Sequence, residues 1–226
     1  MRVLAIDTAL AVCAVAVLDT ERTGMRARES VPMLRGHAEA LMPMIARVMD
    51  AAQLDFAELD RIAVTTGPGS FTGLRVGIAA ARGIALAASK PSVGLTTLAA
   101  YAAPQIANED TVPVVTAIDA RHGQVYLQVF GPGGRTLVPP RVASIADAVR
   151  AAATGPVRIV GSAAGLIAAA WPTGFPAPSL VEAHPAPDID WVARLGAAAA
   201  GPVTPKPLYL KAADAQPQDA FGLARR

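Results

Sequence analysis

The chain has 226 residues, 53% of them hydrophobic and 17% charged, which suits one large globular domain or two closely joined lobes. Its 20 basic and 18 acidic residues give a formal net charge of +2 and are scattered along the chain, which disfavours direct binding to a nucleic-acid backbone. The single cysteine, Cys13, excludes an internal disulfide, and no uncharged apolar run reaches the ~20 residues of a membrane span, so we expect a cytoplasmic protein that does not contact a membrane.

The first half of the chain begins with short segments rich in β-branched residues. Residues 2–7, 11–18 and 25–31 predict an antiparallel meander of three strands. Apolar residues then recur with a period of 3.6 residues over 37–53, which predicts a helix that kinks at Pro43 or begins close to it. The other elements expected in this half are a helical turn, a buried strand and two helices, at residues 54–60, 61–66, 74–88 and 96–106.

The second half of the chain repeats the layout of the first. An apolar run that ends in AID occurs in both halves, so Asp7 and Asp119 fall at equivalent places. The later elements expected here are a strand, a helix, a buried strand and two helices, at residues 135–138, 144–153, 157–161, 163–170 and 188–200. The order βββαβα therefore predicts two α/β lobes, residues 1–110 and 111–226, the second ending in a flexible tail. A single doubly wound sheet is the alternative, but the antiparallel opening of each half counts against it.

The segment TGPGSFTGLRVG, residues 66–77, runs from a predicted strand into a predicted helix. Such a turn presents backbone N–H groups and the positive end of a helix dipole, which is the geometry of an anion site. A helix terminus contributes only about 0.3 to 1 kcal/mol, whereas micromolar nucleotide binding needs about 8 kcal/mol, and the loop has no Walker lysine. We weigh a rigid packing turn equally with an anion-binding or partner-contact loop, and expect Thr72 to cap the helix. The residues of this glycine-rich loop are Gly67, Pro68, Gly69, Ser70, Phe71, Thr72, Gly73 and Arg75.

Candidate catalytic groups are sparse. Asp7 and Asp119 are the only carboxylates that the repeat pairs, so they form the candidate for a vestigial nucleotide site and leave an ATP-binding phosphotransferase or ATPase as the alternative function. His37, His122 and His184 each lack a second histidine at helical spacing, so no metal site is predicted. No catalytic residue is assigned.

Five segments together resemble the TsaB family, also called YeaZ. They are LAIDTA, HAEALMPMI, TTGPGSFTGLRVG, AIDARHGQVY and PLYLKAADA, and the likeness runs in order from residue 3 to about residue 214. The resemblance implies an actin-like ATPase (ASKHA) fold, with two lobes each built on a βββαβα unit. The family has also been called glycoprotease-like or peptidase M22-like, a label that gives no support for proteolysis.

The resemblance also implies a function. The chain would be a noncatalytic scaffold or activating subunit in the synthesis of N6-threonylcarbamoyladenosine at position 37 of bacterial tRNA. It would pair with the paralogous transferase TsaD and with the ATPase TsaE, form a homodimer when alone, and contact tRNA only indirectly. No cofactor is expected, and ATP or ADP would bind only within the complex.

The resemblance places the partner surface on the two helices before and after the glycine-rich loop. Met44→Glu or Ile84→Arg is then expected to break pairing while leaving the fold intact. Two departures from working relatives point away from metal-dependent transfer: His37 is followed by Leu41 in place of a second histidine, and DTALAVCAV lacks a phosphate-loop glycine and lysine. The predicted interface residues are Leu41, Met44, Ile45, Val48, Leu74, Val76, Gly77, Ala80 and Ile84.

Overall fold

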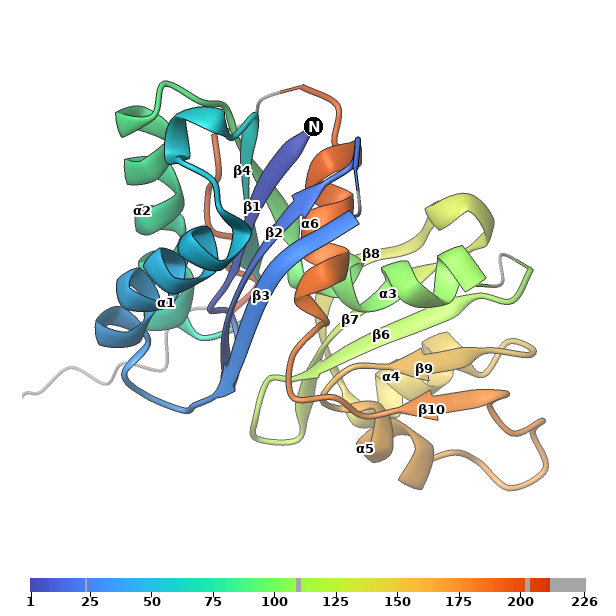
Figure 1. Ribbon diagram of the computed structural model, residues 1–226. Helices are drawn as coiled ribbons and strands as arrows, with labels where there is room; N and C mark the ends of the chain where they lie inside the picture. The colour runs from blue at the N-terminus through green and yellow to red at the C-terminus, as the bar shows by residue number, and fades with distance from the viewer. Residues whose placement is uncertain (23, 109–110, 202–203, 212–226) are drawn as a thin grey trace, which may run out of the picture.

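The computed structural model of the chain describes residues 1–22, 24–108, 111–201 and 204–211, which form two five-stranded mixed sheets (Figure 1). The sequence predicts a tail over residues 210–226, of which residues 212–226 lie outside the described residues. Within the described part, none of the helices has the length and apolar character needed to cross a membrane.

The first sheet has the strand order β3-β2-β1-β4-β5. The first three strands form the predicted antiparallel meander, and the other two strands run parallel to the first. The elements of this half are β1 (Arg2–Asp7), β2 (Val12–Asp19), β3 (Gly24–Pro32), α1 (His37–Ala52), η1 (Phe56–Glu58), β4 (Arg61–Gly67), α2 (Phe71–Ala87), β5 (Ser92–Thr96) and α3 (Thr97–Asn108).

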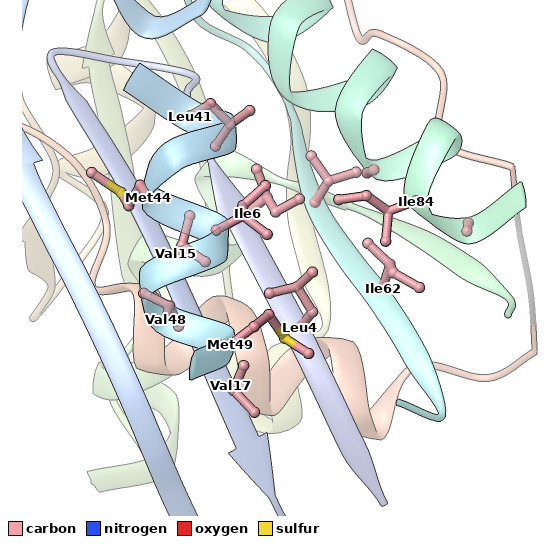
Figure 2. Packing of buried hydrophobic residues seen from close by; sticks show 14 of the residues in the cluster. Leu4, Ile6, Val15, Val17, Leu41, Met44, Val48, Met49, Ile62 and Ile84 are labelled. Atoms are coloured by element: carbon pink, nitrogen blue, oxygen red, sulfur yellow. The ribbon is translucent and has the colours of Figure 1, made fainter. Parts of the chain in front are cut away.

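Helices cover both faces of this sheet because successive strand residues point to opposite sides. Leu4 and Ile6 of β1 pack under α1 and α2, whereas Val3 and Ala5 lie in the cluster that includes residues of the last helix. Figure 2 shows Leu41, Val48 and Met49 of α1 and Ile84 of α2 pointing into this core. Apolar side chains on both faces explain why β1 and β2 read as nearly continuous hydrophobic runs.

The second sheet repeats the topology of the first, with the strand order β10-β9-β6-β7-β8. Asp7 and Asp119 end the corresponding strands of the two sheets, as the repeat predicts. The elements of this half are β6 (Val114–Asp119), β7 (Gln124–Phe130), η2 (Pro132–Gly134), β8 (Thr136–Ser144), α4 (Ile145–Ala152), β9 (Arg158–Val160), α5 (Ala164–Ala169), β10 (Leu180–Glu182) and α6 (Ile189–Ala198).

Each lobe holds one strand more than the sequence predicts, so the observed unit is βββαβαβα. The two unpredicted strands, β5 and β10, are short edge strands with weak alternation. Helix α1 begins at His37 and continues through Pro43, so the late start considered from the sequence is wrong. Helix α2 begins at Phe71, three residues earlier than expected.

A boundary at residue 110 separates the two sheets but not their helices. Helix α3 lies before the boundary, yet Leu98 and Tyr101 pack with Val114 and Phe130 of the second sheet. Helix α6 lies after it, yet Val192 and the neighbouring apolar residues of that helix pack against the first sheet, and in Figure 1 it stands on the face opposite α1 and α2. The lobes therefore exchange a helix, one contributed by each half of the chain.

Candidate functional site

A cleft of about 510 Å³ opens where the two lobes meet. The cleft is lined by four segments: the turn between β1 and β2, the end of β6, the glycine-rich loop and residues 208–211. The remaining lining residues are Leu34, His37, Tyr126, Ser162 and Pro185. The glycine-rich loop thus lies at the mouth of the cleft, as an anion-binding loop would.

Two glycines of the loop, Gly69 and Gly73, are explained by packing against the β1–β2 turn. A Cβ atom added to Gly69 would overlap the carbonyl oxygen of Ala9, and one added to Gly73 would overlap that of Thr8. The amide of Ser70 donates to the Ala9 carbonyl at 2.7 Å, so this N–H group is used within the chain. These contacts account for the loop as a rigid packing turn, the first of the two roles considered from the sequence.

Ser70, and not Thr72, caps helix α2. The Ser70 hydroxyl accepts a hydrogen bond from the Gly73 amide at 3.3 Å, and Ser70 has extended backbone geometry, as an N-cap residue does. Thr72 is the second residue of the helix and is exposed. The prediction of a Thr72 cap is wrong because the helix begins before that residue.

The two repeated aspartates do not face a common site. Asp7 is fully buried and accepts hydrogen bonds from the Thr65 hydroxyl and the Ala9 amide. Burial raises the pKa of the Asp7 carboxyl, and these hydrogen bonds together with the charge of His37 oppose the rise. Asp119 is exposed, lines the cleft and accepts from the Arg121 amide at 2.7 Å.

These residues do not fit a magnesium nucleotide bound between two carboxylates. Asp7 is enclosed beneath the β1–β2 turn, and the glycine-rich loop is packed against that turn through Ser70. Asp119 alone is placed to meet a ligand in the cleft. The proposed vestigial role of the pair stays a prediction.

The three histidines lie on separate elements. His37 is buried at the start of α1, with its Nε2 atom 3.2 Å from the carbonyl oxygen of Leu10. His122 lies in the β6–β7 turn, and His184 follows β10 with Nε2 3.7 Å from a Glu182 carboxylate oxygen. Among the described residues, His, Cys, Asp and Glu side chains nowhere form a group of three able to hold a metal ion.

Most of the predicted interface residues belong to the core of the first lobe. Their side chains are 0 to 9% exposed, because the helical stripe that suggested a partner surface is the stripe that packs on the first sheet. Only Val76 and Ala80 are half-buried and reachable. The buried members of the predicted interface are Leu41, Met44, Ile45, Val48, Leu74, Gly77 and Ile84, and their part in pairing stays a prediction. A charge at Met44 or Ile84 would therefore disturb the fold as well as any partner.

The outward side of the same two helices presents other apolar residues. Met42 of α1 is 50% exposed and Leu86 of α2 is 83% exposed. We refer to Met42, Val76, Ala80 and Leu86 as the α1–α2 surface. Leu86 was missed from the sequence because it lies outside the regular apolar stripe of α2, although an apolar residue at such a position is itself a signal of contact.

The chain was compared with known families and curated proteins. A family model described as "TsaD: tRNA N6-adenosine threonylcarbamoyltransferase" matches residues 31–180. The tRNA threonylcarbamoyladenosine biosynthesis protein TsaB of Escherichia coli is 38% identical over 126 residues, which cover 56% of this chain and 53% of that protein. The match thus spans about half the length of this curated relative. An uncharacterized protein of Mycobacterium tuberculosis is 35% identical over 223 residues, which cover 95% of this chain and 94% of that protein.

Solved structures give the same grouping and the fold. YeaZ from Pseudomonas aeruginosa is 27% identical with a TM-score of 0.72, covering 87% of this chain and 90% of that one. A further Pseudomonas aeruginosa protein, described as similar to peptidase YeaZ, reaches a TM-score of 0.78 at 27% identity over 93% and 99% of the two chains. An inorganic polyphosphate/ATP-glucomannokinase from Arthrobacter matches at 0.50 and 11% identity over 87% and 98%, a likeness of fold alone. The fold is therefore the actin-like ATPase fold.

Proposed function

Because the chain belongs to the TsaB/YeaZ family, we propose that it is a noncatalytic subunit of the machinery that makes N6-threonylcarbamoyladenosine in tRNA. It pairs directly with the transferase TsaD, and TsaE joins the assembly. Contact with tRNA is made through the partners, and ATP or ADP binds only in the assembled complex. Without TsaD, two copies of the chain pair with each other.

The observation that carries this proposal is the α1–α2 surface. Two neighbouring helices expose Met42 and Leu86 on the outside while their inner sides fill the core of the first lobe. Large apolar side chains at exposed helix positions suit packing against the helices of another subunit, and methionine adapts to differing partner shapes. The two most exposed residues of this surface, Met42 and Leu86, are ones that the core of the first lobe does not use.

The residues around the cleft also support a noncatalytic role. Asp7 is buried away from the cleft, and the amide of Ser70 is bonded to the β1–β2 turn. The ring nitrogen of His37 lies against a backbone carbonyl. Asp7 Oδ1, the Ser70 amide and the His37 ring thus make contacts within the first lobe.

Reconstitution tests the proposal. TsaD and TsaE are incubated with threonylcarbamoyl-adenylate and unmodified tRNA, with and without this chain, and the modified nucleoside is measured by mass spectrometry after digestion. We expect product to depend on the chain, and the chain alone to give none. Full product from TsaD and TsaE alone, or product from this chain alone, would contradict the noncatalytic subunit role.

A further inference from the structure

The last described segment of the chain, residues 204–211, crosses the ends of β4 and β5; we call it the strap. The amide of Leu208 donates to the carbonyl oxygen of Thr66 at 2.8 Å. A Cβ atom added to Gly94 would lie 3.3 Å from the Cα atom of Pro205. These contacts fix the strap against the first sheet, beside the glycine-rich loop.

Tyr209 joins the strap to the first turn of helix α2. Its ring lies against the ring of Phe71, with centroids 5.0 Å apart, and its hydroxyl accepts a hydrogen bond from Nε of Arg75 at 3.2 Å. The guanidinium carbon of Arg75 lies 3.8 Å from the centroid of the Phe71 ring, which is a cation–π contact. Three side chains from two segments thus form one closed cluster.

The outward side of this helical turn has few other supports. Phe71, Thr72 and Arg75 are all exposed, and the described cap of the helix is a single long hydrogen bond from the Gly73 amide to Ser70. Helix ends fray unless side-chain contacts hold them. The cluster around Tyr209 supplies such a contact from a segment more than a hundred residues later, since Arg75 and Tyr209 are 134 residues apart.

From these contacts we propose that Tyr209 is a positioning residue that holds the first turn of α2, and with it the α1–α2 surface, in the conformation that pairs with TsaD. The pairing step rests on the proposed function, whereas the hold on α2 does not. Residues 208–211 of the strap also line the cleft, so the same segment contacts both the cleft and helix α2.

Two measurements test the proposal. Amide hydrogen exchange of the free chain reports the hold of Tyr209 on α2, and the affinity for TsaD reports its effect on pairing. For Tyr209→Ala we expect amides of residues 71–77 to exchange about tenfold faster, and the Kd for TsaD to rise by about tenfold because the pairing-competent form of α2 is populated less. Tyr209→Phe keeps the ring contact and loses the acceptor for Arg75, so smaller changes in the same direction are expected. The matched control is Phe175→Ala, an exposed aromatic of the second lobe, for which neither quantity changes.

The outcomes separate the possible failures. Weaker pairing with unchanged exchange at 71–77 means that Tyr209 touches TsaD itself, and overturns the positioning role. Unchanged exchange and affinity together overturn the hold of the strap on α2. If circular dichroism shows that Tyr209→Ala does not fold, then Arg75→Gln, which removes the hydrogen bond to Tyr209 and the cation–π contact with Phe71, gives the same comparison. Failure of the unaltered chain to bind TsaD would count against the proposed function alone, and the exchange measurement would still test the strap.

Discussion

Arg61 and Arg158 hold equivalent places in the two lobes, and each binds the C-terminal end of the helix that its lobe receives from the other half of the chain. Arg61 begins β4 and donates to the carbonyl oxygens of Gly196 and Ala199 at the end of α6, at 2.8 and 2.7 Å. Arg158 begins β9 and donates to the carbonyls of Gln105 in α3 and Val112, at 2.7 and 2.6 Å. A guanidinium also complements the negative end of a helix dipole.

Replacing either arginine should therefore destabilise the whole chain. Both side chains are buried, and Arg61→Met or Arg158→Met would leave backbone carbonyls without their charged donor. A hydrogen bond to a charged group contributes about 1.5 to 3 kcal/mol, so we expect each variant to lose about 2 to 4 kcal/mol of unfolding free energy in urea titrations. Apolar methionine keeps most of the volume, which limits the effect to the lost bonds.

Arg47→Met is the matched control for the buried arginines. Arg47 pairs with Glu29 on the surface, where its side chain is 58% exposed, so the expected loss is below about 1 kcal/mol. Equal losses for Arg47→Met and Arg61→Met would show that the guanidinium–helix contacts do not hold the exchanged helices.

Two glycines of helix α2 should respond to alanine in opposite ways. The Cβ atom of Gly73→Ala would overlap the Thr8 carbonyl oxygen, and overpacking against backbone costs about 1 to 3 kcal/mol. A Cβ atom on Gly83 meets nothing within 4 Å, so Gly83→Ala should stabilise the helix by about 0.5 to 1 kcal/mol. Unfolding free energies of the two variants test this, and a neutral Gly73→Ala would contradict the packing role of the loop.

The sequence predicts the repeated layout because local patterns encode it. The AID segments ending at Asp7 and Asp119 mark the same strand in each lobe. The exchange of α3 and α6 between lobes leaves no local pattern, because it depends on which sheet each helix meets in three dimensions.

The candidate site was harder to predict because apolar periodicity reports burial and not its cause. The stripe through Leu41 and Ile45 would look the same whether it met a partner or the chain's own sheet, and the structure places it on the sheet. The contact between Phe71 and Tyr209 joins two segments that lie far apart in the sequence, and neither segment carries a local signal of it. Asp7 shows the same difficulty. Its position in the repeat suggested a nucleotide site, but the structure places its side chain in the interior of the first lobe.

Asp7 should make stability fall as pH rises. Its pKa in the folded chain is raised by burial, whereas the unfolded chain titrates near the ordinary value of about 3.9. Above that pH the unfolded state releases the proton while the folded state retains it, so the folded state loses stability until pH passes its own raised pKa. Asp7→Asn removes this dependence and keeps an acceptor for Thr65 and Ala9.

Urea titrations between pH 4 and 7 give the unfolding free energies of the unaltered chain and of Asp7→Asn. Their difference isolates Asp7, because the other carboxylates titrate in both proteins. The advantage of Asp7→Asn over the unaltered chain should grow with pH across this window. A constant difference would show that Asp7 titrates alike in the folded and unfolded chains.

Met42 and Met44 offer a direct comparison of surface and core on one helix. Met42 is 50% exposed and Met44 is 1% exposed, although both lie in the methionine-rich segment of α1. Met42→Glu places its carboxylate in water, so the unfolding free energy should change by less than about 0.5 kcal/mol. Met44→Glu buries an unpaired carboxylate and should lose about 3 to 5 kcal/mol.

Met42→Glu, which should hardly change the unfolding free energy, should have a strong effect on pairing with TsaD. A charge at Met42 would be buried against a partner helix, so we expect Met42→Glu to abolish co-elution with TsaD in size-exclusion chromatography while the fold persists. Leu166→Glu, at a similarly exposed helix position of the second lobe, should pair normally. Normal pairing by Met42→Glu would exclude the α1–α2 surface as the contact, because an unpaired carboxylate desolvated against a partner could not be tolerated.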